Sequence, residues 1–93
     1  MVYVQRLKLD VLKPHHPNAL EFATALADLG RETEISLTVE AVDEKTESVV
    51  VEIDGKDINF DVISERIREL GGSVHSIDEV KVVGTESEPG DAG

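Results

Sequence analysis

Four stretches of the chain combine apolar and polar residues with the period of two that is typical of half-buried β-strands. In residues 2–12, Tyr3, Leu7, Leu9 and Val11 fall on one face, while Arg6, Lys8 and Asp10 fall on the other. "EISLTVEAVD" (34–43) and "VVVEID" (49–54) flank the charged turn "DEKTES" and predict a hairpin. After two glycines, "SVHSIDEVKVV" (73–83) predicts a last strand.

Two further segments have apolar residues at helical spacing. The first follows Asn18, a residue type that caps helix N-termini, and Gly30 is placed to end it. The second follows Asn59 and is closed by Gly71 and Gly72. The stiff connection "KPHHP" separates the first strand from the first helix, since proline bars helical geometry in the residue before it. The apolar helix positions are Phe22, Leu26 and Leu29, then Phe60, Ile63, Ile67 and Leu70.

The element order β-α-β-β-α-β predicts an α+β fold of the ferredoxin-like type. Two right-handed split βαβ units give a four-stranded antiparallel sheet in order 4-1-3-2 with both helices on one face. We expect a single domain over residues 1–84, because a chain of 93 residues has no surface to spare for a second core. Residues 85–93 are acidic and contain Gly and Pro, which predicts a disordered tail.

Composition narrows the classes of function. The chain has no cysteine, which excludes disulfides and thiolate metal sites. Its formal charge of −11, from 20 acidic and 9 basic residues, disfavours binding to nucleic acid or anionic membrane. No apolar run approaches the length of a membrane span, so we expect a cytoplasmic protein. The acidic surface suits either a saline environment, where counterions screen repulsion, or docking of a basic partner.

The predicted fold brings the end of the first strand beside the start of the last. Asp10 then lies near residues 73–75, and strand parity puts His75, Ile77 and Glu79 on the open face while Val74, Val80 and Val82 face the helices. Imidazole and carboxylate ligands suit a divalent cation, either calcium or a transition metal. Ordinary solvated polar residues are the alternative, and a catalytic role is the third. The candidate metal ligands are Asp10, His15, His75, Asp78 and Glu79.

The open face of the sheet is predicted to carry apolar residues among charges such as Arg6 and Lys8. This mixture favours self-association into a homo-oligomer, against the alternative of singly exposed apolar residues. No motif of a nucleophile elbow, phosphate-binding loop or zinc protease is present, so an enzyme is not expected. The apolar residues assigned to this face or its margin are Val2, Val4, Val42, Val50 and Ile77.

Three motifs, "LDVLKPH" (9–15), "DINFDVI" (57–63) and "GGSVHSIDEV" (71–80), resemble the archaeal family of domain of unknown function 211. The acidic composition suggests a halophilic member. The resemblance implies a ferredoxin-like fold, ring-like oligomers and divalent cations as ligands, and it offers no catalytic residues. By position, the motifs match Asp10, Lys13 and His15, then Asp57 and Asp61, then His75, Asp78 and Glu79.

Three classes of function follow from these observations. The first is an oligomeric, non-enzymatic binding or regulatory module for a divalent cation or small ligand. The second is a scaffold that presents an acidic surface to a protein partner. The third is an enzyme with a site at a subunit boundary, which only analogy of fold supports.

Overall fold

The computed structural model describes residues 1–85, which form four strands and two helices. The predicted tail lies outside these residues, except for Thr85. The order of the elements is the predicted one. Their bounds are β1 Val2–Pro14, α1 Ala19–Ala27, β2 Glu34–Val42, β3 Thr46–Asp54, α2 Phe60–Glu69 and β4 Ser73–Gly84.

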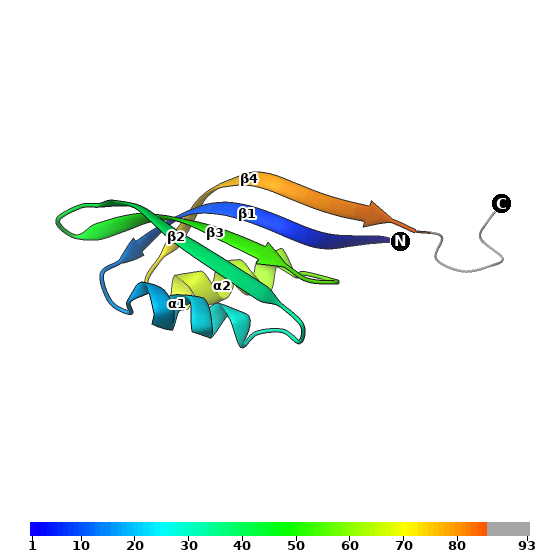
Figure 1. Cartoon of the computed structure of the whole chain (residues 1–93), viewed down its shortest axis with the longest axis horizontal. Helices are drawn as coiled ribbons and strands as arrows, with labels where there is room; N and C mark the ends of the chain where they lie inside the picture. The colour runs from blue at the N-terminus through cyan, green and yellow to red at the C-terminus, as the bar shows by residue number, and fades with distance from the viewer. Residues whose placement is uncertain (86–93) are drawn as a thin grey trace.

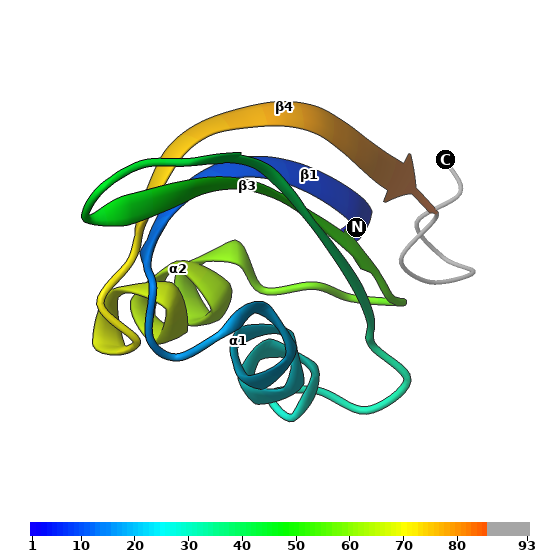
Figure 2. The same ribbon diagram turned by 60° about the vertical axis from the view of Figure 1, so that its left-hand side comes forward.

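The strands form one antiparallel sheet in the order β2-β3-β1-β4, which is the predicted order read from the other edge. Both helices cover the same face, and the other face is open (Figures 1 and 2). The α+β ferredoxin-like prediction is therefore confirmed. At one end of the molecule, the start of β1 and the end of β4 extend together beyond the helices (Figure 1). We call residues 1–4 and 80–84 the β1–β4 arm.

The core lies between the helices and the two central strands. Alternate residues of β1 and β3 point at the helices, as the period of two predicts, and α1 and α2 each contribute one stripe. Ile35, Leu37 and Val74 pack at its margin and are only partly buried. The buried apolar residues are Leu7, Leu9, Val11, Phe22, Leu26, Val49, Val51, Ile53, Ile58, Ile63 and Ile67.

The capping residues act as predicted. The side chain of Asn18 accepts a hydrogen bond from the amide of Glu21, and the Glu21 carboxylate accepts one from the amide of Asn18. This reciprocal pair satisfies two amides that the first turn leaves free. Asn59 caps α2 by accepting from the amide of Val62.

Three predicted boundaries are wrong. β3 begins at Thr46 rather than at residue 49, so the turn predicted over residues 43–48 is shorter by three residues. β1 continues through Pro14, which pairs with Thr46, because a proline at a strand end needs no amide for the ladder. α1 ends at Ala27, with Asp28 as its C-cap, so Leu29 lies beyond the helix and is 38% exposed. The spacing that included Leu29 therefore overestimated the helix by two residues.

Candidate functional site

β-Bulges decide which side chains reach the open face. In β4, Lys8 pairs with Glu79 and Leu9 with Ile77, so Asp78 is an extra residue. Asp10 pairs with Ser76 and Val11 with Val74, so His75 is a second extra residue. Each bulge inserts one residue and resets the alternation of faces. The register therefore keeps the polar pairs Lys8–Glu79 and Asp10–Ser76 on the open face. The apolar residues Ile77 and Val74 lie on the opposite side, with their partners Leu9 and Val11.

Bulges also change which of the apolar residues predicted for the open face lie on it. Gln5 and Glu40 are extra residues in β1 and β2, and they shift parity on those strands as Asp78 does on β4. Val4 consequently packs against the core. Val2 lies two residues before Val4 and shares its face, Val42 pairs with Glu47, and Ile77 pairs with Leu9. All three therefore lie on the side of the helices. Of the predicted set, Val50 alone pairs on the open face, opposite Asp10.

Asp10 and His75 line one hollow on the open face, as predicted from the topology. Asp10 is half-buried and His75 is exposed. Leu12 also lines the hollow, and its register partners on the two neighbouring strands are Ser48 and Ser73. The hollow has a volume of about 340 Å³ and is lined by Asp10, Val11, Leu12, Ser48, Ser73 and His75. It presents one carboxylate, one imidazole and two hydroxyl groups.

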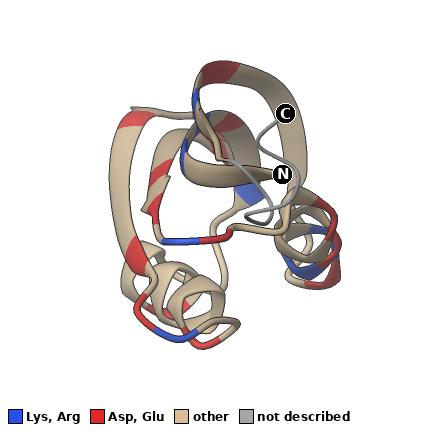
Figure 3. Ribbon diagram, turned by 90° about the vertical axis from the view of Figure 1, so that its right-hand side faces the viewer, with Lys and Arg blue, Asp and Glu red and all other residues tan. Residues whose placement is uncertain are grey.

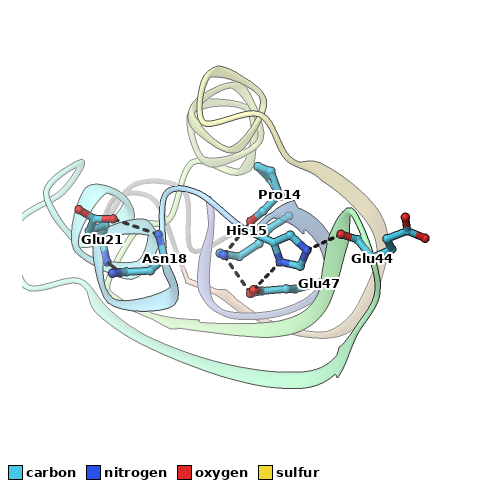
Figure 4. A network of polar contacts seen from close by, with 7 residues as sticks. Pro14, His15, Asn18, Glu21, Glu44 and Glu47 are labelled. Carbon is cyan, nitrogen blue, oxygen red and sulfur yellow. Dashed lines mark hydrogen bonds and ion pairs between the residues drawn. The ribbon is translucent and has the colours of Figure 1, made fainter.

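His15 belongs to a different group of residues. Its ring lies between β1 and the tip of the β2–β3 hairpin (Figure 4). Nδ1 lies 3.0 Å from Oε2 of Glu47, and Nε2 lies 3.0 Å from the main-chain oxygen of Glu44. Both ring nitrogens are thus hydrogen-bonded to this group, away from the hollow of Asp10 and His75.

Glu47 also holds a buried lysine. Lys13 has no exposed surface, and its Nζ donates to Oε1 of Glu47 at 3.0 Å and to the Pro14 carbonyl at 2.8 Å. The ammonium group lies 5.9 Å from the centre of the Phe22 ring. We call Lys13, His15 and Glu47, together with the Glu44 carbonyl, the hairpin latch. It ties the end of β1 to the hairpin.

The charges of the latch shift its pKa values. Hydrogen bonding to Glu47, and then to the Glu44 carbonyl, raises the pKa of His15 above 6.5, because the imidazolium is the better donor. Hydrogen bonds from His15 and then Lys13 lower the pKa of Glu47 below 4.5. The two shifts have one cause, since each partner favours the charged form of the other.

The remaining predicted ligands have partners of their own. Asp78 accepts a hydrogen bond from the hydroxyl of Ser76 at 2.7 Å. Glu79 lies 3.5 Å from Nε of Arg6, which also forms ion pairs with Glu52 and Asp54 on β3. The five predicted ligands are therefore spread over separate groups, with Asp10 and His75 in the hollow. Within residues 1–85, no set of three or more His, Asp or Glu is arranged to hold a metal ion.

The latch and Ser48 were not predicted from the sequence, whereas Ser73 lies in the range 73–75 that was expected near Asp10. A lysine at the end of a strand, next to proline, reads as a surface residue, and Glu47 reads as part of a charged turn. One available signal was parity, because Lys13 continues the inward series of Leu7, Leu9 and Val11. The place of Ser48 in the hollow could not be read from the sequence, because its pairing with Leu12 of β1 follows only from the register of the strands.

Neither helix within residues 1–85 is both long and apolar enough to cross a bilayer. Acidic residues are distributed over helices, strands and turns of the described chain, as Figure 3 shows. The acidic residues are therefore not confined to the hollow.

Comparisons with known proteins agree with the motifs. A model of the family DUF211, described as uncharacterized ArCR, matches residues 5–87. The chain is also similar to an archaeal protein named Uncharacterized protein MJ0319, from Methanocaldococcus jannaschii. The two are 44% identical over 77 residues, which make up 83% of this chain and 79% of that protein.

Proposed function

The chain belongs to the DUF211 family, and from the lining of its open-face hollow we propose that it is a small, self-associating, non-enzymatic binding module. Its ligand is a divalent cation or a small polar molecule that occupies the hollow. The observation that carries this proposal is the convergence of Asp10 and His75, 65 positions apart in the sequence, on one hollow with Ser48 and Ser73. A carboxylate and an imidazole supply two ligands of the kinds that divalent cations use.

A bound cation takes further ligands from outside this pair. Water completes the shell of a cation such as magnesium, which retains several waters when proteins bind it. A small polar ligand instead uses the two serine hydroxyls, which both donate and accept hydrogen bonds. The Asp10 carboxylate in the lining and the net negative charge of the chain favour a cationic ligand over an anionic one.

Exposed apolar residues support the self-association. Val2, Val80 and Val82 lie on the helix side of the β1–β4 arm, where they are 68%, 56% and 51% exposed. Ile77 continues this surface along β4 at 47% exposure. A run of exposed aliphatic residues without an interspersed charge on that side is typical of a contact surface. The homo-oligomer then forms through the arm rather than through the open face.

The excess of acidic residues supports a cytoplasmic protein of a halophilic archaeon. Twenty acidic side chains repel one another in dilute buffer, and molar salt screens that repulsion over about 3 Å. The same screening lets two copies with a charge of −11 approach each other.

Ligand binding is tested by NMR titration of the intact chain with zinc, calcium and magnesium separately. We expect chemical-shift changes at Asp10, Ser48 and His75 with at least one ion, and loss of these changes in D10N and H75A. The matched control is H16A, because His16 is an exposed histidine outside the hollow. Changes that are absent for all three ions, or that survive in H75A, contradict the cation proposal.

Self-association is tested by light scattering over protein and KCl concentration. We expect a mass above that of a 10.1 kDa monomer, and a lower mass for V80D than for V62D. Val62 is a suitable control because it is 44% exposed but lies on α2. A strict monomer at all concentrations, or an equal effect of the two substitutions, contradicts assembly through the arm.

A further inference from the structure

The ring of His15 faces two hydrogen-bond acceptors. On one side is the carboxylate of Glu47, and on the other is the main-chain carbonyl of Glu44, each 3.0 Å away. A neutral imidazole has one N–H group and one lone pair, so it donates to only one of two acceptors. The imidazolium donates to both. The geometry of the latch therefore fits the protonated ring and leaves the neutral ring with an acceptor facing its lone pair.

The charges around the ring agree with this protonation state. The Glu47 carboxylate on β3 is the nearest charge, and the ammonium of Lys13 on β1 contacts the other oxygen of that carboxylate. From the hairpin tip, the Glu44 carbonyl points at the ring while the Glu44 carboxylate points away (Figure 4). The main chain of Asp43 also favours the charged ring. One lysine and one imidazolium thus share a single carboxylate, which has an oxygen for each.

We infer that His15 is a proton-controlled tie that fastens the tip of the β2–β3 hairpin to the end of β1. With the ring protonated, one residue bridges the strand β3 and the turn residue Glu44. When the proton is lost, one of the two hydrogen bonds must break. The bond to Glu44 is the one released, because the neutral ring retains a stronger, charged acceptor in Glu47.

The released segment is short and defined. It is the hairpin tip, residues 43–46. Within the described chain, the main-chain hydrogen bond from the amide of Asp43 to the carbonyl of Thr46 then remains to hold this turn together. Lys13 remains bound to Glu47 throughout, so the strands stay paired and the change is confined to the tip. This tie is independent of ligand binding in the hollow.

The test follows His15 and the hairpin tip by NMR as pH is raised from about 5.5 to about 8.5, a range that spans ordinary histidine titration. We expect the midpoint of His15 to lie above 6.5, the ordinary value for histidine. At low pH both ring nitrogens of His15 carry protons. As the ring titrates, amide exchange at residues 43–46, corrected for its intrinsic pH dependence, increases several-fold.

Two variants separate the tie from general loosening of the fold. H15N cannot titrate, so amide exchange at the tip loses its pH-dependent step, whereas H16N leaves that step unchanged. A His15 midpoint at or below 6.5 overturns the inference. So does a pH step at the tip that persists in H15N.

Discussion

At the scale of single residues, the most consequential feature is a lysine with no exposed surface. Burying an ammonium group costs several kcal/mol unless a counter-charge and hydrogen bonds accompany it. Glu47 and the Pro14 carbonyl supply these partners, and Phe22 supplies an aromatic face. Strand parity alone pointed Lys13 inward, and its partner could not be foreseen, because Lys13 and Glu47 are separated by 34 positions and become neighbours only through the pairing of β1 with β3.

The two members of this ion pair are expected to differ in their response to substitution. E47A leaves the buried Lys13 ammonium without a counter-charge, so it lowers the free energy of unfolding strongly. K13M preserves the volume and the contact with Phe22 and leaves Glu47 bound to His15, so its effect is smaller. Chemical denaturation measures both. E44A is the control, since it removes a carboxylate from the same hairpin but retains the carbonyl that His15 contacts.

An effect of K13M equal to or larger than that of E47A contradicts this assignment of the buried charge.

The shifted pKa values predict how stability depends on pH. The pKa of His15 is raised in the fold, so its contribution is complete below 6.5 and is lost as pH rises through the folded value. The pKa of Glu47 is lowered, so its contribution is complete above 4.5 and is lost as pH falls through the folded value. We expect the latch to contribute most between these two reference values. Denaturation of wild type and H15N across pH measures the difference.

A difference between wild type and H15N that increases above neutral pH contradicts this sign.

At the scale of elements, the alternation of residues predicted each strand, while the bulges changed which face several residues occupy. In β4 the apolar residues Val74, Ile77 and Val80 are spaced by three, not two. This spacing is the signal of two inserted residues, and a strict period of two misplaced Ile77. The bulges at Gln5 and Glu40 leave the same apolar spacing of three, from Val4 to Leu7 and from Val39 to Val42, so a strict period of two misplaced Val4 and Val42 as well.

The start of β4 depends on a close approach between backbones. Gly71 has φ of +91°, which L-residues rarely adopt, and ends α2. A Cβ on Gly72 would lie 2.9 Å from the Leu12 carbonyl oxygen and 3.2 Å from Ile67. We expect G72A to lower the free energy of unfolding by about 1–3 kcal/mol, the usual cost of overpacking. The control is G84A, where a Cβ meets nothing within 4 Å.

Thermal denaturation gives the comparison, and equal melting temperatures for G72A and G84A contradict the close approach.

At the scale of the whole molecule, element order was sufficient to predict the sheet order and the proximity of Asp10 to the start of β4. Chain topology fixes those relations, and they survive errors of one residue. The shared face of Asp10 and His75 was also predictable, although the hollow that they line was not. The position of His15 was not, because its ring is turned toward the hairpin by two acceptors that the strand pattern does not reveal.

Net charge predicts the salt response of the entire fold. Because the chain has 20 acidic residues and 9 basic ones, folding brings like charges close together. Raising KCl from dilute buffer to molar concentration is expected to increase the melting temperature, and sodium chloride is expected to act similarly if screening is the cause. A melting temperature that is unchanged or falls with KCl contradicts the proposal of a salt-adapted surface.

The candidate site depends most on the two bulges that place His75 beside Asp10 on the open face. Cross-strand NOEs between backbone protons of β1 and β4 test this register directly. We predict contacts of Leu9 with Ile77 and of Asp10 with Ser76, as in the structure. An uninterrupted ladder continuing from the pair Leu7 and Val80 would instead give contacts of Leu9 with Asp78 and of Asp10 with Ile77. Those contacts would contradict the site.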